Sequence, residues 1–488
     1  MAGDREDIGI TLADGVTGGQ LLSGLLRQAA ANFPEAFAGL ALPSSEGAFR
    51  SSYGSLLPAF EALRVQSQAA GEIARSLCIS AAAQLRFVDQ AGSRTLPEAL
   101  SVSVPPLPLV RVDLPDKRGL MPAVDYAGRL YVGGQLSRLA EELDQARFAT
   151  RAAVSALTEV GARAEADGGL SLRGERFVLL GAGAELSPVY TLLEAGADVL
   201  WLDRERPPID RLLEPRLGGA LSYVDRGIDL LTQPAAVRAT ILDFAQGSPL
   251  HVGLYAFARH RALPLRLALG MNELVRSLPA ALVKSLTFLL SPTSVNFIYP
   301  EDGERADQRA KSMSTMRRAL LRTGQLQPGY TAAAEQRISA AVVSPQGAAY
   351  QVGEYVGKRL AAEAFCEFGS ALDGRASDTL FVSANMAPVS RTRSLASPVL
   401  TAAILGAPSF DMLIAQASTA RAVSSLLAVH DVLEHPRKAT RGERQRSLFA
   451  RQFHGGVHAQ PYALDGIIRV AALKGIAQRP KLALELLR

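Results

Sequence analysis

Residues 177–204 read FVLLGAGAELSPVYTLLEAGADVLWLDR, and this stretch limits the possible folds more than any other part of the chain. It predicts a buried strand, a glycine turn, a helix, a second strand and a terminal acid. Short apolar runs of this kind form buried parallel strands, and parallel strands need a crossover helix between them. The stretch therefore predicts one strand–helix–strand unit of a parallel sheet.

The turn after the first strand has the composition of a nucleotide-binding loop. Its two glycines allow a tight turn and a close approach of the backbone to a ligand. Ser187 and Pro188 then predict the N-cap and the first residue of the helix. Asp203 ends the second strand 20 residues after Gly183, where a carboxylate can bind ribose hydroxyls. The residues expected to bind a cofactor are Gly181, Ala182, Gly183, Ala184, Glu185, Asp203 and Arg204.

The sequence leaves the cofactor itself open. Leu186 stands where the third glycine of a G-x-G-x-x-G pattern would be, and Glu185 puts a negative charge near the position of a pyrophosphate. Arg204 could accept a 2′-phosphate, which favours NADP over NAD. Methyltransferases that use S-adenosylmethionine share the glycine loop and the acid, and their cofactor has no pyrophosphate. A strand, turn and helix without any ligand would have the same pattern.

The chain alternates strands and helices well beyond this unit. With 488 residues, 48% of them hydrophobic and 20% charged, it is long enough for two or three globular domains. Further strands are expected at residues 221–224, 250–256, 284–292 and 379–385. Strands that alternate with helices predict an α/β fold with a doubly wound, Rossmann-like parallel sheet. We expect an N-terminal α/β or α-rich domain (1–173) with a long helix at 135–164, a nucleotide-binding domain (174–396) and a helical C-terminal extension (397–488).

Several classes of protein are not favoured by the composition. The net charge of +5 is small and arginine is scattered, so we expect no nucleic-acid partner. No apolar run is long enough to span a membrane, the polar N-terminus is not a signal peptide, and two distant cysteines suit a reducing, cytoplasmic compartment. His454 and His458 flank two glycines, which predicts a loop and no metal site. Frequent alanine and arginine favour a GC-rich, bacterial genome, and the helical tail is a candidate lid or homodimer contact.

A resemblance to a known family comes from the second half of the chain. Residues 379–393 (TLFVSANMAPVSRTR) resemble the sixth strand and following loop of short-chain dehydrogenases, and residues 350–365 are similar to their catalytic helix. That family transfers hydride between NAD(P) and a carbonyl or alcohol, using Tyr-x-x-x-Lys on the helix and a serine after the preceding strand. The resemblance implies Tyr355 as the general acid/base, Lys358 as the cation that lowers its pKa, and Ser291 as the residue that orients the substrate.

This chain departs from the family pattern in two ways. Tyr355 and Lys358 are three residues apart, whereas Tyr350 has Glu354 in the lysine position. The serine could also be one of two others, Ser294 and Ser344. We therefore expect an NAD(P)-dependent oxidoreductase that acts on a small molecule. A methyltransferase and a non-catalytic nucleotide-binding scaffold are the alternatives.

Overall fold

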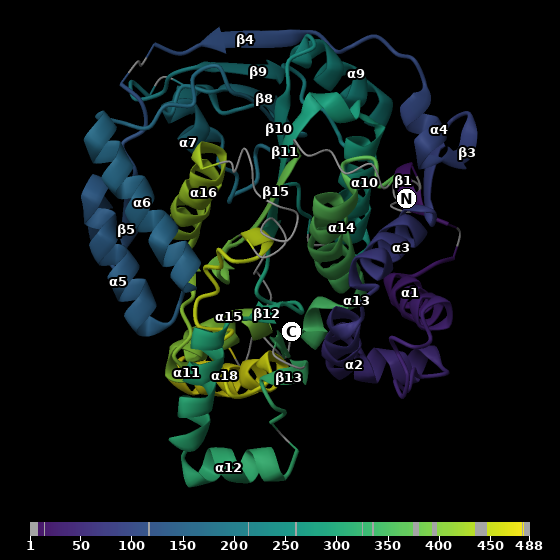
Figure 1. The fold of residues 1–488 in the computed structure, drawn as a ribbon, viewed down its shortest axis with the longest axis vertical. Helices are drawn as coiled ribbons and strands as arrows, with labels where there is room; N and C mark the ends of the chain where they lie inside the picture. The colour runs from purple at the N-terminus through teal and green to yellow at the C-terminus, as the bar shows by residue number, and fades with distance from the viewer. Residues whose placement is uncertain are drawn as a thin grey trace.

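A seven-stranded sheet forms the centre of the molecule (Figure 1). The structure is a computed structural model that describes residues 8–13, 15–115, 118–212, 214–258, 261–324, 326–333, 336–373, 380–392, 398–434, 447–480 and 482. The strand order is β15-β11-β10-β7-β8-β9-β4; the first six are parallel, and β4 is antiparallel to β9. The strands are β4 (Leu109–Asp113), β7 (Arg176–Leu180), β8 (Asp198–Leu202), β9 (Ala220–Val224), β10 (Leu250–Leu254), β11 (Val283–Leu290) and β15 (Phe381–Met386).

The strand order reverses between β7 and β10. From β7 the chain adds β8 and β9 on one side, and it then returns to add β10, β11 and β15 on the other side. In open α/β sheets, ligands bind at such a reversal, outside the carboxyl ends of the strands. The fold therefore places the residues that follow β7 and β10 where a ligand site is expected.

Both faces of the sheet are buried. In β7, Val178 and Leu180 belong to the core on one face, whereas Phe177 and Leu179 belong to the core on the other. Strands that are apolar on both faces are typical of parallel sheets covered by helices on two sides. The expected α/β class with a mainly parallel sheet is thus confirmed.

One face carries two layers of helices. Those against the sheet are α9 (Pro234–Ala245), α10 (Leu263–Ser277) and a continuous helix made of α13 (Ala348–Gln351), the π-helical segment η4 (Val352–Leu360) and α14 (Ala361–Phe368). Outside them lie α1 (Gly18–Asn32), α2 (Glu46–Gln66), α3 (Ala70–Ala82) and α4 (Leu96–Ser101), as Figure 1 shows on the right. A small sheet of β1 (Gly9–Leu12), β2 (Leu85–Asp89) and β3 (Gly92–Thr95) joins this layer. The first hundred residues thus share one core with the central sheet.

The other face is covered by helices from three parts of the chain. They are α5 (Leu136–Ala146), α6 (Arg151–Asp167), α7 (Val189–Glu194) and α16 (Ala417–Leu433). The hairpin β5 (Ala123–Tyr126) and β6 (Arg129–Val132) packs beside α5 and α16, and α8 (Ile209–Leu212) is a short turn after β8. Helix α16 therefore brings a segment from the last fifth of the chain back onto the sheet.

The expected long helix at 135–164 is two helices, so this prediction is wrong. Arg147 ends α5 in the left-handed conformation (φ +55°), which a helix cannot continue. Thr150 then begins α6 because its side chain accepts a hydrogen bond from the amide of Ala153. The break lets α5 and α6 pack against each other.

A third group of elements lies below the carboxyl ends of the strands in Figure 1. It has its own apolar core. The group contains α11 (Pro300–Lys311), α12 (Thr315–Arg322), α15 (Pro398–Gly406), α18 (Leu464–Gln478), a sheet of β12 (Phe297–Ile298), β14 (Gln336–Ser339) and β13 (Tyr330–Ala333), and the pair β16 (Ser390–Arg391) and β17 (Ala415–Gln416). Two positions of the family-like segment, residues 379 and 393, lie outside the described residues. Among the helices described, none has the length and apolar character needed to cross a bilayer.

Candidate functional site

A large cleft opens at the carboxyl ends of four parallel strands. Its volume is about 1290 Å³, and its walls include residues that follow β7, β10, β11 and β15. Residues 16–19 at the start of α1 and residues 344–350 also line it. The cleft thus lies at the strand-order reversal, where ligands bind in this type of sheet.

The glycine bend after β7 forms one wall of this cleft. Gly181 has a positive φ of +87°, and a Cβ atom there would lie 2.3 Å from the backbone of Ala256. Only glycine fits at this position. Gly183, Ala184 and Glu185 line the cleft, whereas Ala182 is buried in the core beneath it.

Asp203, which follows β8, is hydrogen-bonded to the glycine bend. The amide of Gly183 donates a hydrogen bond to Asp203 Oδ2 at 3.0 Å, and Asp203 is not among the residues that line the cleft. Burial raises the pKa of Asp203 above its usual value. The side chain of Arg204 is 80% exposed and forms an ion pair with Asp229 at 3.5 Å, and it too is outside the cleft lining.

The bend offers few free amides to a phosphate. The amides of Gly181 and Ala182 donate to the carbonyl oxygen of Leu202, and the amide of Ala184 donates to the carbonyl oxygen of Gly181. Helix α7 begins only at Val189 and has six residues, and Ser187 does not cap it with its side chain. The predicted cap is therefore wrong, and the amides of residues 181–184 are not free to bind a pyrophosphate.

The three predicted catalytic residues do not meet. Lys358 and Ser291 both line the cleft, but Tyr355 is fully buried on another side of the same helix. The Tyr355 hydroxyl donates to Glu61 Oε2 of α2 at 2.6 Å, and burial raises its pKa well above the usual value. Tyr355 therefore faces the N-terminal helices and not the cleft.

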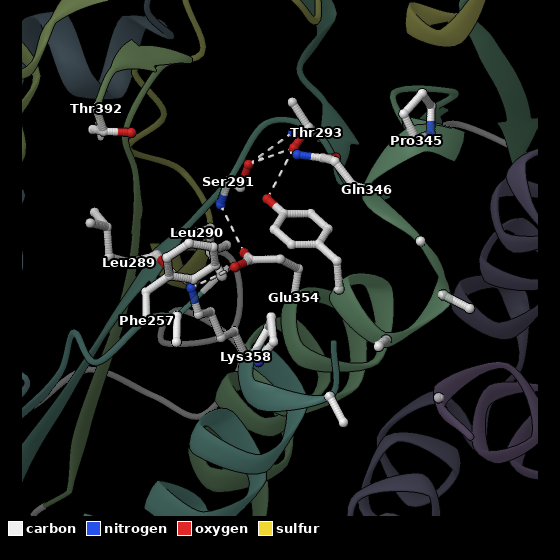
Figure 2. A pocket seen from close by; sticks show the side chains of 18 of the residues that line it. Phe257, Leu289, Leu290, Ser291, Thr293, Pro345, Gln346, Glu354, Lys358 and Thr392 are labelled. Atoms are coloured by element: carbon white, nitrogen blue, oxygen red, sulfur yellow. Dashed lines mark hydrogen bonds and ion pairs between the residues drawn. The ribbon is translucent and has the colours of Figure 1, made fainter. Parts of the chain in front are cut away.

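Tyr350 occupies the place in the cleft that Tyr355 was expected to hold. Its hydroxyl lies 3.1 Å from Thr293 Oγ1, which lies 2.8 Å from Ser291 Oγ (Figure 2). Burial, and next the charge of Glu354, raise the pKa of Tyr350 above its usual value. Ser344 also lines the cleft, whereas Ser294 is buried and donates to Gln351.

Glu354 links the two ends of this group. Its carboxylate accepts a hydrogen bond from Lys358 Nζ at 2.6 Å and another from the Ser291 amide at 3.2 Å, as Figure 2 shows. Lys358 also donates to the carbonyl oxygen of Leu289 at 3.2 Å and lies 5.9 Å from the ring of Phe257. We call Ser291, Thr293, Tyr350, Glu354 and Lys358 the polar row. The row combines a phenol, two hydroxyls, a carboxylate and an ammonium, which can bind an oxygen-containing group and move a proton.

Helix geometry explains the row. Tyr350, Glu354 and Lys358 are spaced by four residues, and residues at this spacing share one helix face. From residue 352 to 360 the helix is a π-helix, a rare form with wider turns that is frequent at functional sites. Tyr355 is one residue out of step, so it points elsewhere. The four-residue spacing was the sequence signal for Tyr350 and Glu354; nothing in the sequence singled out Thr293.

No group of three or more metal-ligating side chains occurs in the part of the chain that the structure describes. His454 and His458 stack on each other in a buried loop, where His454 Nε2 pairs with Asp302 at 3.0 Å. No protein-family model and no curated protein matches this chain.

Proposed function

We propose that this chain is an NAD(P)-dependent oxidoreductase with a Rossmann-like sheet that acts on the carbonyl or alcohol group of a small molecule. The polar row in the cleft is the observation that carries the proposal. The strand order, read from β9 to β15, follows the 3-2-1-4-5-6 pattern of dinucleotide-binding sheets, which supports it. Along the chain, the residues of the row also lie between the fifth and sixth parallel strands, β11 and β15, as do the catalytic residues of short-chain dehydrogenases.

In this proposal Tyr350 replaces Tyr355 as the proton donor. The phenol of Tyr350 carries its proton at neutral pH, as phenols generally do, and its position in the row would let it donate that proton to a carbonyl oxygen. Its raised pKa makes it a weaker acid, which counts against this role in the absence of ligand. Ser291 and Thr293 would orient that oxygen by hydrogen bonds. Lys358 balances the charge of Glu354, which lies between it and Ser291 in the row. A bound nicotinamide would supply the hydride.

The cleft and the bend differ in how well they suit a dinucleotide. The cleft is large enough, and Gly183 and Ala184 lie where an adenosine would approach the sheet. The amides of these two residues, however, already have acceptors within the protein. We therefore propose that the adenosine side of the cofactor is held mainly by packing, with little contribution from backbone amides to its phosphates.

Thermal unfolding with added nucleotides tests the cofactor. We expect at least one of NAD, NADH, NADP and NADPH to raise the melting temperature, because binding to the folded state stabilises it. If none of the four does so, the proposal is wrong. Binding without turnover of any aldehyde, ketone or alcohol supplied would instead support a non-catalytic scaffold.

Two tyrosine variants test the proton donor. Tyr350→Phe should lower the turnover number by about 100-fold or more while leaving cofactor binding intact, because it removes general acid catalysis. Tyr355→Phe is the matched control from the same helix. It should retain turnover but lower the stability of the protein, because it removes the hydrogen bond to Glu61. The opposite result would return the role to Tyr355.

A methyltransferase is the second candidate. It is favoured by the occupied amides of the bend, since S-adenosylmethionine has no pyrophosphate that would need them. Stabilisation by S-adenosylhomocysteine and by none of the four dinucleotides would select it.

A further inference from the structure

A second, smaller cavity lies between α15 and α18, in the last part of the chain. Its volume is about 50 Å³, and its walls are almost entirely apolar. The side chains that matter here are Leu400, Ala403 and Ile404 of α15 and Leu464, Ile467 and Ile468 of α18. A cavity with such walls stays dry and accepts apolar groups.

The small cavity adjoins the main cleft at the polar row. Four residues line both spaces: Thr293, Gln346, Val389 and Leu400. Thr293 is hydrogen-bonded to both Ser291 and Tyr350, and Figure 2 shows Gln346 beside it. A ligand could therefore place a polar head at the row and an apolar end in the cavity.

The two helices that line the cavity, α15 and α18, approach each other closely. A Cβ atom at Gly406 would lie 2.0 Å from the carbonyl oxygen of Ala471, and one at Gly475 would lie 1.9 Å from that of Ala402. The backbones of α15 and α18 are therefore in close contact at these two points. With a volume of about 50 Å³ and apolar walls, the cavity suits a short apolar group.

We infer that the substrate carries a short, unbranched acyl or alkyl chain, with its oxygen at the polar row and its chain between α15 and α18. The position of the oxygen rests on the proposed oxidoreductase function. The position of the chain rests on the cavity alone.

Binding of straight-chain primary alcohols from two to ten carbons, measured by isothermal titration calorimetry on the full chain, tests this inference. Affinity should rise about fourfold with each methylene until the cavity is filled, and then stop rising. Ala403→Leu, which fills the cavity, should end the rise at a shorter alcohol. Ile404→Ala, which enlarges it, should extend the rise to longer alcohols. Leu405→Ala is the control, because Leu405 belongs to the same helix and apolar core but does not line the cavity.

An affinity series that does not depend on chain length, or that Ala403→Leu and Ile404→Ala both leave unchanged, would overturn the inference. If Ala403→Leu does not fold, as judged by circular dichroism, Ile404→Ala decides alone. A chain-length limit that moves with the cavity variants, in a protein that no dinucleotide stabilises, would reject the oxidoreductase and keep the acyl or alkyl ligand.

Discussion

Lys358 and Glu354 form an ion pair that is largely removed from water. Their side chains are 12% and 5% exposed, and the two charges lie 2.6 Å apart in the wall of the cleft. A buried charge that loses its partner is costly, because the remaining ion is neither hydrated nor paired. We therefore expect a change to either residue to alter both the stability of the protein and the charges in the cleft.

We expect Lys358→Met to lower the free energy of unfolding by about 3–5 kcal/mol, because Glu354 is left as an unpaired buried charge. The double variant Glu354→Gln/Lys358→Met should recover most of this loss, and urea denaturation measures both. Glu46→Gln is the control, since it breaks an exposed pair with Arg50 and should cost no more than about 1 kcal/mol. A double variant as unstable as Lys358→Met would contradict the argument.

The residue scale also shows how far the sequence could predict the site. Gly183, Lys358 and Ser291 were expected near a ligand, and all three line the same cleft. The tyrosine was less predictable, because Tyr350 and Tyr355 lie five residues apart on one helix and only the helix rotation decides between them. The pairing of Tyr355 with Glu61, almost three hundred residues earlier in the chain, left no local pattern to read.

Among the elements, the bend between β7 and α7 depends on one glycine. Gly181→Ala combines a left-handed backbone, which costs about 1–2 kcal/mol, with a clash against Ala256. Gly174→Ala is a matched control, because Gly174 has a similar φ of +83° and open space around it. Gly181→Ala should therefore be less stable than Gly174→Ala by about 1–3 kcal/mol in urea denaturation. Equal losses of unfolding free energy in the two variants would show that the bend can adjust to a side chain at residue 181.

Elements of the sheet were more predictable than the helices around it. The runs at 221–224, 250–256 and 284–292 became β9, β10 and β11, because a strand buried on both faces must be apolar along its length. The run expected as one helix at 135–164 is interrupted at Arg147, which has a left-handed conformation between α5 and α6. Periodicity alone does not reveal such a break.

At the scale of the whole molecule, two carboxylates connect distant segments. Burial would raise the pKa of Glu61, but the charges of Arg359 and Arg64 outweigh burial and lower it to about 2. The hydrogen bond from His251, together with that from Lys284, lowers the pKa of Glu175 to about 2 as well. Glu61 thus joins α2 to η4, and Glu175 joins β7 to β10 and β11.

These pKa values predict instability in acid. A carboxylate whose pKa is lower in the folded state stabilises the fold fully above its unfolded pKa, about 4.5, and this contribution disappears as the pH falls towards 2. The free energy of unfolding should therefore decline steadily below about pH 4.5, as urea denaturation at a series of pH values would measure. Glu61→Gln should be less stable at neutral pH and should show a weaker decline. A stability that stays constant down to about pH 3 would contradict this account.

The edge strand β4 is synthesised long before the strand that receives it. It pairs with β9, and β9 in turn rests on β8 and β7, all of which follow it along the chain. While translation proceeds, the nascent polypeptide therefore carries an open strand outside the ribosome until residue 220 and its successors have emerged. A nascent chain stalled before β9 has left the ribosome should bind chaperones through this unpaired strand, whereas one long enough to expose β9 can pair β4 with it.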